Sequence, residues 1–217
     1  ADLEPELIDS VLPRLVKSKR LNVGYFTGEF APFHKGHNGV VDTALTKGSL
    51  DLVFVIPTPH ATNDPKTVNF SRKEWEERRA FVKAGLADNN HAWLWPFKIE
   101  SEKEVKLGQT IEDLESFLKP NKPLTHVFGM DSYHRVLARD LQKTFPRPRI
   151  AVTRPGVPIP DTQLGSQVQV IENVFSGPVS ATRILHDVAI TGESDDLRSE
   201  VLDIVLKTPR YLRILSE

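Results

Sequence analysis

The sequence predicts an α/β fold in which helices cover both faces of a parallel β-sheet. The 217-residue chain changes repeatedly between the two-residue apolar spacing of strands and the wider apolar spacing of helices. Several apolar runs are hydrophobic on both faces, which is typical of parallel strands buried between two helical layers. Strands that alternate with helices along a chain favour this architecture over separate strand and helix regions.

The first elements are each indicated by a separate local pattern. Aliphatic residues at helical spacing predict an amphipathic N-terminal helix over 4–18, within a segment comprising residues 1–20. Residues 21–26 and 51–57 are apolar runs with the length of buried strands, and a helix is expected between them over 38–45.

The later elements follow by the same reasoning. Ser71, with Glu74 three residues later, has the pattern of a helix N-cap, and its helix is expected to reach about Ala87. A strand over 92–98 would place alternate aromatic side chains on one face, namely Trp93, Trp95 and Phe97. The remaining predicted elements are strands over 124–129, 149–153 and 168–172 and helices over 110–118, 132–143, 181–190 and 195–206.

The composition narrows the class of protein. With 28 basic and 29 acidic residues, the net charge of −1 argues against a nucleic-acid partner bound through a broad basic surface. The chain has no cysteine, which excludes disulfides and thiolate metal sites. No apolar run approaches the ~20 residues that cross a bilayer, and the N-terminus does not have the pattern of a signal peptide. We therefore expect a soluble protein with no membrane partner, located in the cytoplasm, with the nucleus left open.

The decapeptide GEFAPFHKGH, residues 28–37, carries the strongest functional signal. It lies between a predicted strand and a predicted helix, where parallel sheets bind their ligands. Gly28 lets the backbone approach a phosphate, and the helix N-terminus beyond it favours an anion. His34 and His37 share a face if their turn is helical, and each can donate an N–H to a phosphoryl oxygen, with Lys35 adding positive charge. This pattern favours phosphoryl or nucleotidyl transfer, which depends on positioning and charge stabilisation.

Two other interpretations of the histidine pair stay open. Two histidines three residues apart could bind zinc, although the sequence shows no evident third ligand, so no protein-bound metal is predicted. A histidine can also be purely structural. Long loops over 58–70 and 154–166, rich in Pro, Thr, Asn and Asp, are expected to border whatever site is present.

GEFAPFHKGH resembles the signature of the nucleotidyltransferases that carry a His-x-Gly-His motif, and especially of the nicotinamide/nicotinate mononucleotide adenylyltransferases. Further segments are similar to motifs of that family and occur in the expected order. They are FSRKEWEERRAFVKAGL (70–86), LGQTIEDLESFL (107–118), VFGMDSY (127–133), VTRPG (152–156) and VSATRI (179–184). The resemblance implies a Rossmann-like fold of the nucleotidyltransferase type, with one domain over 21–217 that ends in the helices of 181–206.

The resemblance also implies a reaction in NAD biosynthesis. The 5′-phosphate of nicotinamide (or nicotinate) mononucleotide would attack the α-phosphate of ATP, giving NAD (or its deamido form) and pyrophosphate. Mg²⁺ would bridge the triphosphate oxygens. The implied partners are therefore ATP and a pyridine mononucleotide, and a homo-oligomeric state is possible but open.

Roles carry over by motif to individual residues. The expected catalytic residues are His34, His37 and Arg183. The expected ATP-binding residues are Thr27, Gly28, Lys35, Gly36, Gly129, Asp131, Ser180 and Thr182. The expected binding residues for the pyridine mononucleotide are Trp93, Trp95, Thr110 and Arg154.

Two positions depart from the family pattern. Glu29 places an acid directly after Gly28, where it would repel a triphosphate unless it points away or meets a cation. The family arginine of the second signature would fall at Leu185, whereas the sequence has Arg183, which lies on roughly the opposite face of a helix. We expect Arg183 to supply the missing charge, with Lys35 or another basic residue as the alternative.

Several of these residues also fit simpler structural roles. Both tryptophans could be core residues, Asp131 and Ser180 could be helix caps, and Arg154 could be a surface residue. The arginines of the 72–79 region are expected on a solvated helix face. Two other functions also stay open: transfer to a different phosphorylated metabolite, and a nucleotide-binding sensor that has lost catalysis.

Overall fold

The computed structural model describes residues 12–57, 72–94, 107–129, 147–156, 168–177, 179–208 and 211. Several predictions lie outside the described residues: the helix over 132–143, the cap at Ser71, the loop over 58–70, and the side chains of Trp95 and Asp131. Of the predicted helix over 4–18, the structure describes α2 (Leu12–Ser18).

A six-stranded parallel sheet organises the chain, as the sequence predicts. Its order is β3-β2-β1-β4-β5-β6. The strands are β1 (Val23–Gly28), β2 (Leu52–Pro57), β3 (Ala92–Leu94), β4 (Thr125–Gly129), β5 (Arg149–Thr153) and β6 (Val168–Glu172). The chain builds outward from β1 to β3 and then returns to the other side of β1 at β4. The strand order therefore reverses between β1 and β4, and open parallel sheets bind ligands in the crevice expected beyond the carboxyl ends of the strands at such a point.

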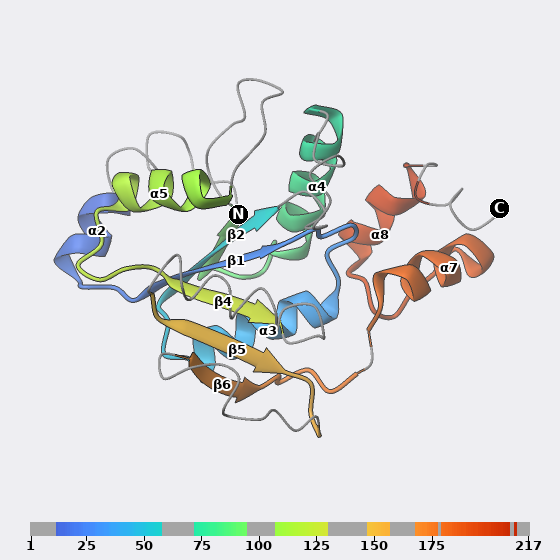
Figure 1. Ribbon diagram of the computed structural model, residues 1–217. Helices are drawn as coiled ribbons and strands as arrows, with labels where there is room; N and C mark the ends of the chain where they lie inside the picture. The colour runs from blue at the N-terminus through green and yellow to red at the C-terminus, as the bar shows by residue number, and fades with distance from the viewer. Residues whose placement is uncertain are drawn as a thin grey trace.

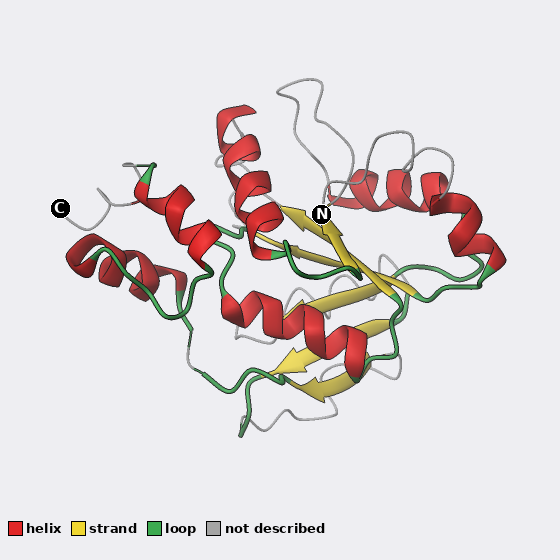
Figure 2. Ribbon diagram, turned by 180° about the vertical axis from the view of Figure 1, so that it is seen from behind, coloured by secondary structure: helices red, strands yellow, loops and turns green. Residues whose placement is uncertain are grey.

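The described helices cover both faces of this sheet (Figures 1 and 2). In addition to α2 they are α3 (Lys35–Thr46), α4 (Arg72–Gly85), α5 (Leu107–Leu118), α7 (Ala181–Thr191) and α8 (Ser199–Leu206). Helix α8 packs against α4, and α2 packs against α5. The arrows of β1, β4 and β5 in Figure 1 point toward the side of the molecule where α7 and α8 lie.

Strand alternation divides the core into two clusters. In β1, Phe26 belongs to the cluster shared with α3, α4, α7 and α8, whereas Tyr25 belongs to the cluster shared with α2 and α5. In β2, Val53 and Val55 face the first cluster and Phe54 faces the second. Neighbouring side chains of a strand point to opposite faces, so both faces of the central strands are buried. This explains why these segments are apolar throughout in the sequence.

Several element bounds differ between the sequence predictions and the structure, and β1, predicted over 21–26, spans Val23–Gly28. Helix α3 begins at Lys35 and α5 at Leu107, each three residues earlier than predicted. Helix α8 begins at Ser199, four residues later than predicted, because residues 195–197 form a turn. The strands over 149–153 and 168–172 have the predicted bounds.

Candidate active site

The decapeptide runs from the last residue of β1 into the first turn of α3, at the carboxyl edge of the sheet where β1 and β4 are neighbours (Figure 1). The two strands pair in parallel from Gly24 opposite Thr125 to Phe26 opposite Val127. Each strand continues two residues further, β1 to Gly28 and β4 to Gly129. Gly28 and Gly129, two of the three glycines predicted to lie near ATP, therefore end adjacent strands at the same edge of the sheet, and Thr27 is the residue before Gly28.

His34 and His37 cap the first turn of α3 reciprocally. His34 is the N-cap, and its Nδ1 accepts a hydrogen bond from the backbone N–H of His37 at 3.3 Å. In return, the backbone N–H of His34 donates to Nδ1 of His37 at 3.2 Å. The two rings stack with centroids 3.6 Å apart and planes 16° apart. The pair has the geometry of a capping box in which imidazoles replace the usual hydroxyl and carboxylate.

This geometry fixes the protonation state of both rings. A ring nitrogen that accepts a hydrogen bond carries no proton, so each neutral imidazole keeps its proton on Nε2. Burial, and after it the charge of Arg154, lowers the pKa of His34 from 6.5 to about 4. Burial and the neighbouring His34 lower the pKa of His37 well below its ordinary value. At neutral pH the site therefore offers two uncharged Nε2–H donors.

Three phenylalanines surround His37. The ring of Phe30 meets the imidazole edge-on, with centroids 5.0 Å apart and an interplanar angle of 88°. Phe33 and Phe26 contribute rings at 5.3 and 6.2 Å. Phe30 and Phe33 are fully buried and pack against each other at 5.2 Å. Because these rings belong to the core, they hold the imidazole in one orientation.

The two glycines of the decapeptide leave room for neighbouring rings, Gly28 for that of Phe30 and Gly36 for that of His34. A Cβ at Gly28 would stand 2.7 Å from the ring of Phe30, and one at Gly36 would stand 3.1 Å from Cε1 and Nδ1 of His34. Any side chain at Gly28 would therefore displace a ring that touches His37. At Gly36 the added Cβ would crowd the imidazole of His34, whose Nδ1 accepts the capping hydrogen bond.

Distant segments anchor the loop and the helix start. Nη1 of Arg78 in α4 donates to the backbone carbonyl of Glu29 at 3.2 Å. The carbonyl of Asp196, between α7 and α8, accepts a hydrogen bond from the backbone N–H of Lys35 at 2.9 Å. Arg78 is half-buried, so the prediction that the arginines of this helix lie on a solvated face is wrong for Arg78.

The second signature forms the start of α7. Ser180 is its N-cap residue by backbone geometry, but its side chain makes no capping hydrogen bond. Thr182 and Arg183 are exposed in the first turn, and Nε of Arg183 lies 3.7 Å from Oδ2 of Asp187. Leu185 is 9% exposed and belongs to the core cluster, so the position expected for the family arginine faces the protein interior.

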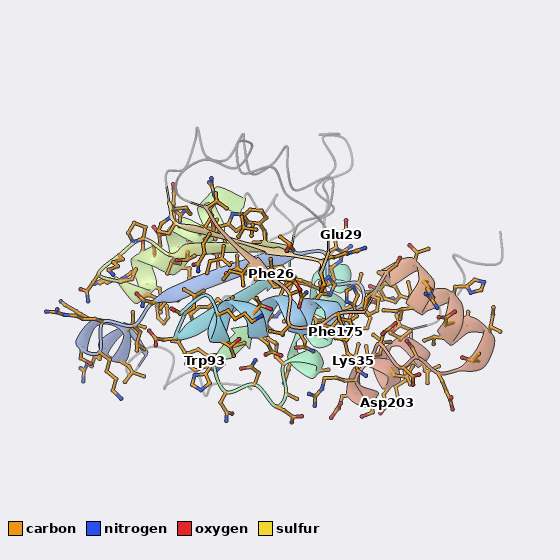
Figure 3. All side chains as sticks on the ribbon, turned by 90° about the horizontal axis from the view of Figure 1, so that it is seen from below. Phe26, Glu29, Lys35, Trp93, Phe175 and Asp203 are labelled. Carbon is orange, nitrogen blue, oxygen red and sulfur yellow. The ribbon has the colours of Figure 1, made fainter. Side chains whose placement is uncertain are left out.

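The residues predicted to bind the pyridine mononucleotide lie in different places. Arg154 follows the last residue of β5 at the carboxyl edge and is exposed. The ring of Trp93 packs edge-on against Phe54 at 5.8 Å, which is the contact expected of a core residue. Trp93 lies well away from Glu29 and Lys35 in Figure 3. The backbone of Thr110 lies in α5, but its side chain is outside the described residues. All binding roles stay predictions.

Sequence reasoning missed Phe30, Phe33, Arg78 and Asp196 as parts of this site. The phenylalanines lie inside the decapeptide, and their aromatic spacing was the signal that could have identified them. Arg78 is 49 residues from Glu29 in sequence, and the role of Asp196 rests on a backbone carbonyl. Neither contact has a local sequence signature.

The fold is that of the nucleotidyltransferases, and a family match agrees with it. A family model described as cytidylyltransferase-like matches residues 25–186, and the chain belongs to this family. Within the described ranges, no helix is long and apolar enough to cross a membrane.

Relatives within the family have more specific names. A probable nicotinate-nucleotide adenylyltransferase of Rubrobacter xylanophilus is 27% identical over 203 residues, covering 88% of this chain and 85% of that protein. One from Synechococcus sp. (strain JA-2-3B'a(2-13)) is 25% identical, covering 84% of this chain and 86% of that protein.

Solved structures share the fold. The Plasmodium falciparum nicotinic acid mononucleotide adenylyltransferase complexed with APC matches with a TM-score of 0.62 at 15% identity, over 88% of this chain and 97% of that one. The same enzyme complexed with NaAD matches with a TM-score of 0.61 at 17% identity.

Proposed function

We propose that this protein transfers the adenylyl group of ATP to a pyridine mononucleotide, with release of pyrophosphate. The observation that carries the proposal is the reciprocal cap between His34 and His37, which presents two neutral N–H donors at the carboxyl edge of the sheet where β1 and β4 are neighbours. The names of the relatives support nicotinate mononucleotide as the first substrate to test, with nicotinamide mononucleotide as the second.

In the proposed reaction, an oxygen of the mononucleotide 5′-phosphate forms a bond to the α-phosphorus of ATP. The bond from that phosphorus to the bridging oxygen breaks, and pyrophosphate leaves with that oxygen. Negative charge develops on the phosphoryl oxygens, and the Nε2–H groups of His34 and His37 stabilise it. Preorganised donors are effective in such a role because they need no reorientation during the reaction.

The other ATP contacts of the proposal begin with the helix that the pair caps. The N-terminus of α3 contributes its partial positive charge, and the exposed Lys35 adds a full one. The remaining proposed contacts to ATP are from Thr27, Gly28, Gly36, Gly129, Ser180 and Thr182.

Mg²⁺ is proposed to enter with ATP. Its coordination in enzymes of this kind rests largely on phosphate oxygens and water, with few protein carboxylates. Among the described residues, no group of three or more His, Asp or Glu side chains gathers into a metal site. We therefore propose that the triphosphate of ATP would bind the Mg²⁺ ion, and that the ion would neutralise part of the triphosphate charge.

A direct assay tests the function. Purified protein is incubated with ATP, Mg²⁺ and either mononucleotide, and products are separated by chromatography. We expect the dinucleotide and pyrophosphate from at least one of the two. Absence of dinucleotide from both would contradict the proposal. Parallel reactions with pantetheine phosphate and with a phosphorylated sugar alcohol identify a different acceptor if neither pyridine nucleotide reacts.

A second candidate function is a nucleotide-binding sensor without turnover. The observation that favours it is that the position of the family arginine holds a leucine, Leu185, which is buried in the core. Calorimetric titration with ATP, run beside the assay, separates the two functions. ATP binding with no product from any acceptor would identify the sensor.

A further inference from the structure

The triphosphate of ATP needs positive charge that the second signature does not supply. Leu185 is part of the apolar core. Arg183, two residues earlier, is 70% exposed at its side chain and has the carboxylate of Asp187 3.7 Å away on the next turn of α7. That carboxylate offsets part of the charge that Arg183 would offer to a phosphate. A guanidinium that replaces the family arginine must therefore come from another element, in addition to the charge of Lys35 on α3.

Arg154 is placed to be that cation. Strand β5 pairs with β4 so that Val152 lies opposite Gly129. Arg154 comes two residues after Val152 and one residue after the end of β5, so it stands just past the carboxyl edge that carries Gly28 and Gly129. Its side chain is exposed, and it is followed by a turn in which Gly156 has a φ of 77°.

The backbone before Arg154 is tied to the helix that carries the histidines. The carbonyl of Thr153 accepts a hydrogen bond from the backbone N–H of Asn173 at 2.8 Å. The next residue, Val174, donates its backbone N–H to Oγ1 of Thr43 in α3 at 3.0 Å. Asn173 also packs so closely on Gly39 of α3 that a Cβ there would stand 2.4 Å from its Oδ1. The end of β5 is therefore braced against α3, whose N-cap is His34.

The effect of Arg154 on the pKa of His34 is consistent with a position of Arg154 near the histidine pair. The charge of Arg154 acts on the imidazole of His34 and lowers its pKa, after the larger effect of burial. Such an effect between an exposed guanidinium and a ring requires proximity, because charges in water are screened within about 10 Å. Phosphates bound by the Nε2–H of His34 would thus come within range of Arg154.

We propose that Arg154 binds the phosphates of ATP beside His34 and supplies the charge that is missing at Leu185. This inference rests on the proposed function, and it moves Arg154 from the pyridine mononucleotide to the triphosphate. Arg154 is a phosphate-binding residue whose planar guanidinium can form two parallel hydrogen bonds to phosphate oxygens.

The test compares five proteins: wild type, Arg154→Ala, Arg154→Lys, Arg183→Ala and Arg14→Ala. Arg14 is exposed on α2, remote from the crevice, and controls for the loss of one positive charge. Kinetics are measured with ATP varied at saturating mononucleotide and then with the mononucleotide varied. We expect Arg154→Ala to lower kcat/KM for ATP about 10- to 100-fold, the range of a lost charged hydrogen bond. Arg154→Lys should restore part of that loss, and Arg14→Ala should match wild type.

Two readouts do not depend on turnover. Calorimetry should show weaker ATP binding by Arg154→Ala, and NMR titration should show a higher pKa for His34 in that variant than in wild type. Unchanged ATP binding, an unchanged His34 pKa, a loss confined to the mononucleotide, or a larger loss of ATP binding in Arg183→Ala would each overturn the inference. If wild type forms no dinucleotide, the proposed function fails, and these two readouts still decide the role of Arg154.

Discussion

His34 and His37 each accept, through Nδ1, a hydrogen bond from the backbone N–H of the other, at 3.3 and 3.2 Å. The same two bonds begin helix α3 and fix the tautomer of both rings. Local folding and chemistry are therefore coupled in one turn of the chain. The cap needs unprotonated Nδ1 atoms, and the proposed reaction needs protonated Nε2 atoms, so a single protonation state serves both.

Replacing His37 should separate these two roles. His37→Ala removes the cap and the donor, and we expect turnover to fall by a factor on the order of 10²–10³ while the protein stays folded. His37→Gln keeps a side chain that can cap the helix at this position, so it should recover stability but not turnover. Assays of kcat with thermal unfolding of both variants check this. Wild-type turnover in His37→Ala would contradict the role of His37.

The lowered pKa of His34 predicts a pH dependence of stability. Its pKa is about 4 in the folded protein, against 6.5 for an ordinary histidine in the unfolded chain. Between these values the unfolded chain binds a proton that the folded protein does not, so the free energy of unfolding falls as pH falls through this range. The slope is about 1.4 kcal/mol per pH unit for one such group, and His37 acts in the same direction.

His34→Asn tests this dependence because asparagine can still cap α3 but does not titrate. Denaturant unfolding between pH 4 and 7 should show a shallower slope for His34→Asn than for wild type. His91→Asn, which removes an exposed histidine, is the control. Identical slopes for wild type and His34→Asn would show that His34 is not held neutral by the fold.

Gly28 is expected to be intolerant of any side chain. A Cβ there would stand 2.7 Å from the ring of Phe30, which is buried and contacts His37. Overpacking of this kind costs about 1–3 kcal/mol, so Gly28→Ala should lower stability by that amount and reduce turnover. Gly129→Ala, at the end of β4, meets only Val40 at 3.7 Å and should change stability little. Chemical denaturation of both variants gives the comparison, and equal stabilities would be the contrary result.

Arg78 is expected to stabilise the loop before the histidines. Its guanidinium donates to the carbonyl of Glu29 at 3.2 Å, across 49 residues of sequence. Hydrogen bonds that involve a charged group contribute about 1.5–3 kcal/mol, so Arg78→Ala should lower stability by about this amount and raise the KM for ATP. Lys73→Ala, an exposed position on the same helix, is the control. No difference between the two variants would remove Arg78 from the site.

The sequence predicted the sheet well because the relevant physics is local. The strands over 149–153 and 168–172 have their predicted bounds, and the parallel arrangement follows from runs that are apolar on both faces. Helix α3 begins at Lys35 rather than at the predicted residue 38 because its N-cap is a histidine, His34, which is not a usual N-cap residue.

The position of the candidate site could be predicted from the sequence, but the contacts that hold its loop and helix start in place could not. The decapeptide and its position at the end of β1 were predicted, and the structure places both there. The anchors Arg78 and Asp196 act on residues far from them in sequence, and one of them acts through a backbone carbonyl. Such contacts depend on tertiary packing, which residue spacing does not encode.

The most direct test of the central claim follows the α-phosphate of ATP. Wild-type protein is given ATP labelled at the α-phosphorus, Mg²⁺ and both pyridine mononucleotides, and label and pyrophosphate are measured over time. We predict that label enters a dinucleotide in equal amount to the pyrophosphate released, and that His37→Gln slows both together. Label that stays in ATP, or that appears only in AMP, would contradict adenylyl transfer by this histidine pair.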